Sequence, residues 1–98
     1  MSGLEGAREF TAQMSIRTGH WRLYVVLPNR IEVWPAYLFG RAIPTFTDRT
    51  DALSVLGFEP VPGAEWEWTE DSEIHDDPTS AAVLIAAIRV RSQSGVSV

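Results

Sequence analysis

The chain has 98 residues, of which 45% are apolar and 21% charged, and this balance is typical of one folded domain rather than a disordered segment. It contains no cysteine, which excludes disulfide bonds, thiolate nucleophiles and cysteine-ligated zinc. Its 13 acidic and 8 basic residues give a formal net charge of −5, so we expect no nucleic-acid partner. The longest apolar run is too short to cross a bilayer and no secretory signal is visible, so we expect a cytoplasmic protein with no membrane partner.

Shifts in composition divide the chain into a central domain and two flanks. Residues 1–19 hold several glycines and show no sustained period, so they predict a flexible N-terminal arm. Residues 20–91 predict a single α+β domain. Residues 92–98, in which serine and glycine recur, predict a short C-terminal tail.

The first half of the central domain is predicted to form a β-hairpin. Residues 20–27 are rich in alternating aromatic and β-branched side chains, which is typical of a strand. After a compact turn signal, residues 31–34 alternate again. Pro35 cannot donate a ladder hydrogen bond and is expected to end or bend this second strand, so residues 36–46 predict a loop.

A short helix is predicted to follow this loop. Thr47 or Asp48 can cap its first turn, and apolar residues between positions 52 and 56 supply one face. Gly57 favours the left-handed conformation that ends a helix. Because a helix of this length is marginal alone, we expect it to dock on a sheet.

Two further strands are predicted after the helix. Residues 65–69 alternate between Glu or Thr and Trp. Residues 81–91 favour a strand through their β-branched content, while their alanines leave a helix as the alternative. One antiparallel register pairs each acid with an arginine and each tryptophan with a β-branched residue: Glu67 with Arg89, Glu65 with Arg91, Trp68 with Ile88, and Trp66 with Val90.

The resulting order predicts an α+β fold, in which a four-stranded antiparallel sheet has one short helix packed on one face. If the final strand lies at an edge of this sheet, it can pair with its copy in a second chain. A homodimer through an edge strand is therefore left open.

No catalytic constellation is visible in the sequence. His20 and His75 are its two histidines, and no Ser-His-acid order, glycine-rich phosphate loop or zinc-binding spacing accompanies them. We therefore predict no catalytic residue, no cofactor and no metal site, and a chain that is not an enzyme. The acidic segment 70–77, predicted to be a loop, matches no calcium-binding loop. A domain that binds a small molecule or a divalent metal is the alternative.

Two features instead favour a protein partner. Aromatic rings at Trp34, Tyr37 and Phe39 lie on a predicted irregular segment, and such segments often carry function. The acidic segment suits a basic surface. Trp66 and Trp68 project from one sheet face, either as core or as a stacking platform. The candidate partner-binding residues are Trp34, Tyr37, Phe39, Glu70, Asp71, Glu73, Asp76 and Asp77.

Three parts of the sequence carry a resemblance: residues 21–27, the Trp34-Pro35 pair, and the stretch that leads from Leu56-Gly57-Phe58 to Glu70. Over residues 12–91 the chain resembles a family of small uncharacterised actinobacterial proteins. That resemblance implies an origin but no activity, and no functional residue is carried over.

A second resemblance is local. Residues 23–36, a strand, a short turn and a strand ending in Trp-Pro-Ala, are similar to the hairpin of MbtH-like proteins, which bind and assist adenylating enzymes of peptide synthetases. The downstream Pro-x-Gly-Trp segment of that family is missing here, so the similarity implies only an analogous use. The sequence as a whole predicts a small non-enzymatic protein-binding module with an accessory or regulatory role.

Overall fold

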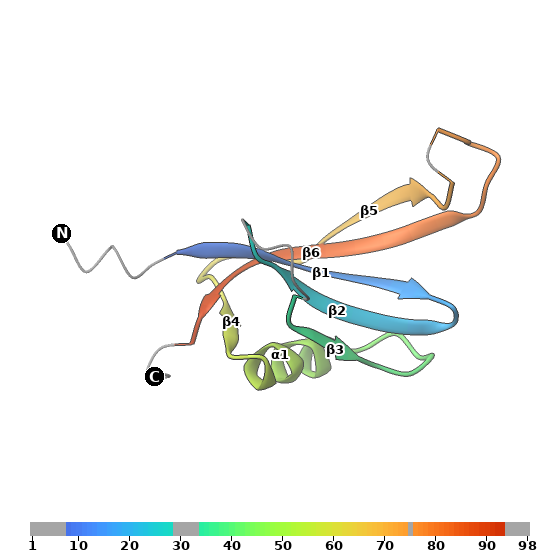
Figure 1. Cartoon of the computed structure of the whole chain (residues 1–98). Helices are drawn as coiled ribbons and strands as arrows, with labels where there is room; N and C mark the ends of the chain where they lie inside the picture. Colours follow the sequence, from blue (N-terminus) through green and yellow to red (C-terminus); the bar gives the residue numbers. More distant parts are fainter. Residues whose placement is uncertain (1–7, 29–33, 75, 94–98) are drawn as a thin grey trace.

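The computed structural model describes residues 8–28, 34–74 and 76–93 (Figure 1). The described chain forms one antiparallel sheet with one short helix, which confirms the predicted α+β class. The elements are β1 (Glu9–Arg17), β2 (His20–Val26), β3 (Ala36–Leu38), α1 (Phe46–Val55), β4 (Phe58–Pro60), β5 (Glu67–Ser72) and β6 (Ala82–Ser92).

The described sheet has six strands and not the predicted four. They lie in the order β3, β2, β1, β6 and β4, and β5 also pairs with β6. The 11-residue strand β6 pairs with β1 along one side, and along the other with β4 near its C-terminal end and with β5 over its first half. The final strand is therefore internal and offers no free edge to a second copy. The edges of the described sheet are β3 on one side and β4 and β5 on the other.

Part of the predicted flexible arm is the central strand β1. Its apolar residues alternate with polar ones, and Ala12 and Met14 are completely buried between β2 and β6. Thr18 and Gly19, with φ angles of 49° and 82°, form the tight turn that joins β1 to β2. The arm prediction is wrong for Glu9–Arg17, because glycines on both sides obscure a short period-2 pattern. Residues 1–7 lie outside the described chain.

The predicted second hairpin strand, residues 31–34, lies outside the described residues except for Trp34. Pro35 does not end the pairing, because its carbonyl still accepts a hydrogen bond from the Val25 amide at 3.0 Å. Ala36–Leu38 then continue as β3 beside β2. The loop prediction for residues 36–46 is therefore wrong for these three residues and for Phe46, the first residue of α1.

The predicted helix is confirmed, but its cap is Thr45 rather than Thr47 or Asp48. The Thr45 hydroxyl accepts from the Asp48 amide at 3.1 Å, and the Asp48 carboxylate accepts from the Thr45 amide at 3.0 Å. This reciprocal capping box satisfies two amides that the first turn leaves without helical partners. Gly57 ends the helix as predicted, with a φ of 92°, and its amide donates to the Ser54 carbonyl at 3.0 Å.

The strand prediction for the last element is confirmed, but the predicted register of the last hairpin is wrong by two residues. Glu67 lies opposite Ala87 and Trp68 opposite Ala86. Because the shift is even, each side chain keeps its predicted face of the sheet. The two arginines of β6 form ion pairs outside this hairpin: Arg89 with Glu9 at 3.3 Å, and Arg91 with Glu59 at 2.7 Å.

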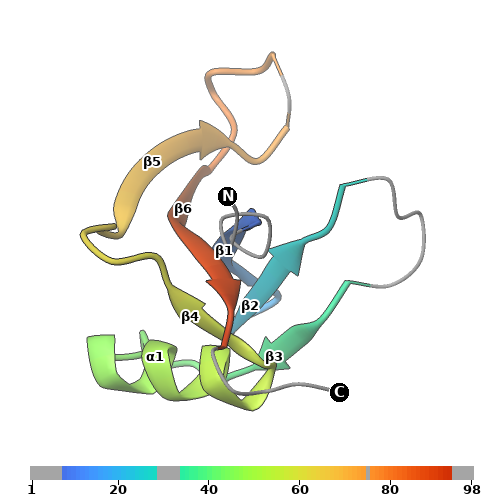
Figure 2. The same ribbon diagram turned by 90° about the vertical axis from the view of Figure 1, so that its left-hand side faces the viewer.

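The core lies on the face of the sheet that α1 covers. Figure 2 shows α1 beneath β3 and β4, with β5 at the upper left, curving away from the helix. Leu53 of α1 is completely buried against the central strands. The buried strand residues in this cluster are Ala12, Met14, Trp21, Leu23, Val25, Ala86, Ile88 and Val90.

Candidate binding face

The opposite face of the sheet is covered by no described helix or strand. Side chains of a strand alternate between faces, and residues directly opposite each other share one, so the pairing assigns each residue to a side. We call this side the open face. Its residues include Thr11, Gln13, Ser15 and Arg17 of β1, Arg22 and Tyr24 of β2, Val83, Ile85 and Ala87 of β6, and Glu67, Thr69 and Asp71 of β5, with Trp34 stacked on Tyr24.

An aromatic ridge stands on the open face over β2. The rings of Tyr24 and Trp34 are stacked, with centroids 6.1 Å apart and planes 16° apart. The Tyr24 hydroxyl donates to Gln13 Oε1 at 2.8 Å, which fixes that ring over β1 and β2. The Arg22 guanidinium lies 5.5 Å from the Tyr24 ring centroid, within cation–π range. The ridge therefore combines flat apolar surface with a cation.

Two adjoining hollows lie beside the ridge. One, of about 300 Å³, is lined by Arg22 and Trp34 together with Ser15, Arg17 and Tyr24. The other, of about 280 Å³, shares those last three residues and continues across β6 to the β5–β6 hairpin. Its further lining includes Asp71, Glu73, Val83 and Ile85.

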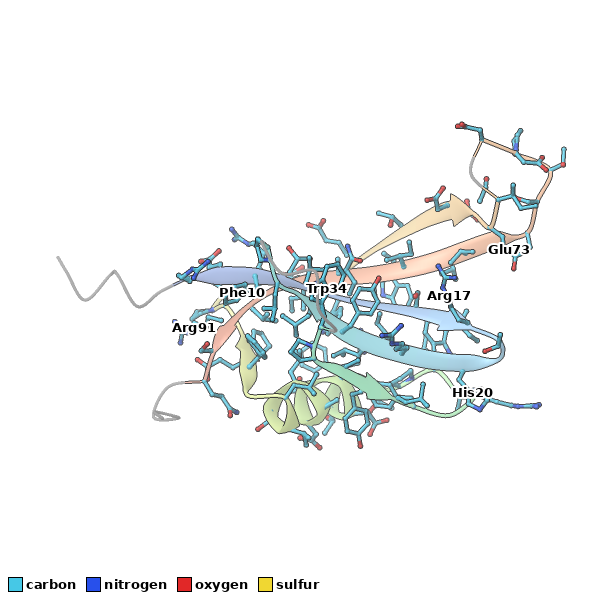
Figure 3. The ribbon with its side chains drawn as sticks, in the orientation of Figure 1. Phe10, Arg17, His20, Trp34, Glu73 and Arg91 are labelled. Atoms are coloured by element: carbon cyan, nitrogen blue, oxygen red, sulfur yellow. The ribbon has the colours of Figure 1, made fainter. Side chains whose placement is uncertain are left out.

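The two sides of these hollows carry opposite charges. Arg17 and Arg22 lie on the β1–β2 side, and Asp71 and Glu73 lie on the hairpin side. None of the four forms an ion pair with another described residue. Figure 3 shows Arg17 at the end of β1 near the hairpin that carries Glu73, with Trp34 over the middle of the sheet. The open face can therefore orient a ligand that carries both charges.

The structure separates the candidate residues predicted from the sequence. Trp34 lines one hollow of the open face, and Asp71 and Glu73 line the adjoining one. Tyr37 and Phe39 lie in register with Leu23 and Trp21, which places them on the face that α1 covers. Their rings contact each other, with centroids 4.9 Å apart. The predicted aromatic surface is thus divided between two sides of the sheet.

The acidic segment is also divided. Glu70–Ser72 belong to β5, so the loop prediction for residues 70–77 is wrong for its first three residues. Glu70 lies opposite Leu84, on the side of the sheet that faces α1. Asp76 has a positive φ of 68°, and His75 lies outside the described residues.

Asp77 serves the turn at the tip of the hairpin. Its carboxylate accepts from the Thr79 amide at 3.0 Å and from the Thr79 hydroxyl at 2.6 Å. These two hydrogen bonds lower the pKa of Asp77 below its ordinary value, because they stabilise the ionised form. The Ser80 hydroxyl donates to the Asp77 carbonyl at 2.7 Å and accepts from the Ile74 amide at 3.1 Å.

The two tryptophans near β5 have different surroundings. Trp66 is half-buried and packs against the core, whereas Trp68 keeps 41% of its surface exposed and meets Trp21 edge-on at 6.0 Å. The Arg49 guanidinium lies 5.0 Å from the Trp66 ring and 5.9 Å from the Trp68 ring. Partial burial there lowers the pKa of Arg49. The pair is therefore part core and part exposed rim on the α1 side.

The sequence interpretation missed the floor of the open face. The sequence predicts Ser15 and Arg17 in a flexible arm, and it gives Arg22 and Tyr24 no role beyond the strand of residues 20–27. The available signal was the alternation of polar with apolar residues from Phe10 to Arg17, which places Gln13, Ser15 and Arg17 on one side.

Among the described residues, no three His, Asp or Glu side chains group closely enough to hold a metal ion. No described helix is long and apolar enough to span a membrane.

Comparison with known protein families gives a match over most of the chain. The profile of a family of unknown function, DUF6303, matches residues 8–98 and therefore includes all seven described elements. The chain belongs to the DUF6303 family. This agrees with the resemblance to a family without an assigned activity. No curated protein and no solved structure matches this DUF6303 chain.

Proposed function

We propose that this domain is a non-enzymatic protein-binding module with an accessory or regulatory role, and that its cytoplasmic partner binds on the open face. The observation that carries the proposal is the hollowed face itself, which no described helix or strand covers. Small domains usually cover both sides of a sheet or keep the free side flat and polar. Here the free side is hollowed beside an aromatic ridge.

The chemistry of the open face supports a macromolecular partner. Aromatic residues and arginine are enriched where proteins bind each other, and Tyr24, Trp34 and Arg22 supply both in one ridge. The charges of Arg17 and Asp71, neither of which forms an ion pair with another described residue, lie on opposite sides of one hollow. Complementary charges on a partner would fix its orientation, which is the main contribution of charge to an interface.

The local similarity to MbtH-like proteins supports the accessory role. Those proteins act by binding an enzyme, and the similar residues 23–36 include Tyr24 and Trp34 of the aromatic ridge. The actinobacterial origin implied by the sequence resemblance indicates the cell lysate in which to seek the partner.

A matched pair of substitutions tests the proposal. Thr69 lies exposed on β5, with its hydroxyl 3.4 Å from the Ile85 carbonyl at the border of the open face. Thr47 lies exposed on α1, on the other side of the molecule. We expect Thr69→Arg to weaken binding at least tenfold, because a long cation then overhangs the hollow. Thr47→Arg should leave the affinity within twofold.

The measurement uses the full chain as bait in an actinobacterial lysate, followed by calorimetry with the purified partner and each variant. Circular dichroism establishes that both variants fold. Equal affinity of the two variants for the partner would remove the open face from the interface.

A small-molecule site is the second candidate, and the hollow of about 300 Å³ favours it. This volume is at the lower end of the range for ligand pockets. Two arginines beside a stacked Tyr–Trp pair suit a flat anion. Recovery of no stoichiometric protein in the capture experiment would favour this candidate over a protein partner.

A further inference from the structure

The outer edge of β5 has backbone groups that no described strand pairs. The Glu73 amide donates to the Ala81 carbonyl at 2.8 Å, and this bond fixes the alternation along the hairpin. The odd-numbered residues of β5 therefore bond to β6, and the amides and carbonyls of Trp68 and Glu70 point outward. The outward amide of Ser72 is already satisfied by the Asp71 carboxylate at 2.7 Å.

The negative charge around this edge favours a basic binding partner. Residues 65–81 contain seven of the 13 acidic residues and none of the 8 basic ones: Glu65, Glu67, Glu70, Asp71, Glu73, Asp76 and Asp77. The formal charge is therefore −7 in this segment and +2 in the rest of the chain. A second copy of β5 would meet like charges across the new pairing, which opposes a homodimer at this edge. A basic segment would meet opposite ones.

We propose that the edge of β5 accepts an extended basic segment of a partner protein as an added strand. The inference rests on the proposed function and names the chemistry of the partner. The added strand bonds to the backbone of Trp68 and Glu70 and places alternate lysine or arginine side chains beside Glu67 and Asp71 on the open face. Its intervening apolar side chains lie beside Trp68, a residue that is 41% exposed.

The test uses a synthetic octapeptide of alternating arginine and valine with blocked ends, titrated into the full-length chain and followed by NMR. We expect saturable binding that slows amide hydrogen exchange at Trp68 and Glu70 at least tenfold. The amides of Thr69 and Asp71 should change little, because they already bond to β6. Binding with no slowing at Trp68 and Glu70 would overturn the added strand.

Two substitutions at one position separate backbone pairing from charge. Glu70→Gln and Glu70→Pro remove the same charge, but only proline also removes the outward amide, and it breaks no bond to β6. We expect Glu70→Gln to bind within threefold of the wild type and Glu70→Pro to bind at least tenfold more weakly than Glu70→Gln. Equal affinity of the two variants would mean attraction by charge alone and would contradict the proposal.

A modified peptide covers the case in which Glu70→Pro disturbs the strand. Methylation of the backbone nitrogens at alternate positions leaves the peptide's charge intact and removes its edge-facing donors. We expect at least tenfold weaker binding when the methylated positions face β5, and no loss would contradict the proposal.

If these tests fail while Thr69→Arg still weakens binding of the natural partner, the inference falls and the proposed function stands. If Thr69→Arg has no effect, the proposed function falls.

Discussion

Acidic residues close together in this sequence have different roles, and Asp77 is the clearest case. Its carboxylate is occupied by the amide and hydroxyl of Thr79 at the tip of the β5–β6 hairpin. Glu67 and Asp71 instead line the open face and form no ion pair with a described residue. The sequence places Asp71 and Asp77 in one acidic segment. Asp77 accepts both donors of Thr79 in the turn, whereas Asp71 accepts only the amide of its neighbour Ser72 and lines a hollow of the open face.

The pKa of Asp77 tests this assignment. The ordinary value is 3.8, and the hydrogen bonds from Thr79 lower it. Since the folded-state pKa is depressed, the stabilisation is present above the unfolded value and is lost as the pH falls through the folded value. Thr79→Val removes the hydroxyl donor and should raise the pKa of Asp77, measured by NMR titration of its carboxyl carbon. Thr69→Val serves as the control, and an unshifted pKa in Thr79→Val would contradict the role assigned to the hydroxyl.

At the scale of elements, β1 decides both the core and the binding face. One side of this strand contributes Ala12 and Met14 to the core, and the other contributes Ser15 and Arg17 to the open face. It pairs with β2 on one side and with β6 on the other, so it joins the β2–β3 pair to the β5–β6 hairpin in one sheet. Ser15 and Arg17 of β1 line both hollows, so the binding face depends on this strand.

Substitution of Met14 tests the place of β1. Met14 has no exposed surface, so Met14→Ala removes buried apolar atoms and leaves a cavity. Such changes lower the free energy of unfolding by about 2–5 kcal/mol. Val55→Ala on α1, at a residue that is 72% exposed, should change it by less than about 0.5 kcal/mol. Urea denaturation measures both, and an unchanged midpoint for Met14→Ala would mean that residues 9–17 are an arm after all.

The elements that could be predicted from the sequence are those with strong local signals. The strand after His20 has a dense β-branched pattern, and Gly57 marks the end of the helix. The three-residue strands β3 and β4 show no such signal, because pairing with β2 and β6 creates them. Their length is too short for a period to be detected.

The register of the last hairpin shows a second limit. Pairing of Glu67 with Arg89 satisfies charge, but so does the observed pair of Arg89 with Glu9, a distant residue in β1. The sequence does not show which of these two pairs forms. The turn determines the register, because its hydrogen bonds among Ile74, Asp77 and Ser80 hold Glu73 opposite Ala81. The open face was missed for the same reason, because it forms only when β1 and β5 both pair with β6.

At the scale of the whole molecule, charge and shape are distributed unevenly. The helix lies on one side of the sheet (Figure 2). The core packs on that side, and the ridge and hollows occupy the other. The acidic hairpin borders the open face, while the rest of the chain carries a small positive charge. This polarity would give a basic partner one preferred approach, and the attraction should weaken as salt is added.

The most direct test of the open face is hydroxyl-radical footprinting of the full chain, free and bound to its captured partner. Tyr24 and Trp34 report on the open face, and Phe46 and Val55, which are 62% and 72% exposed, report on α1. We expect the partner to reduce oxidation of Tyr24 and Trp34 by at least half and to leave Phe46 and Val55 unchanged. Protection of Phe46 and Val55, with Tyr24 and Trp34 unaffected, would show that the partner binds the helix side and would contradict the proposed binding face.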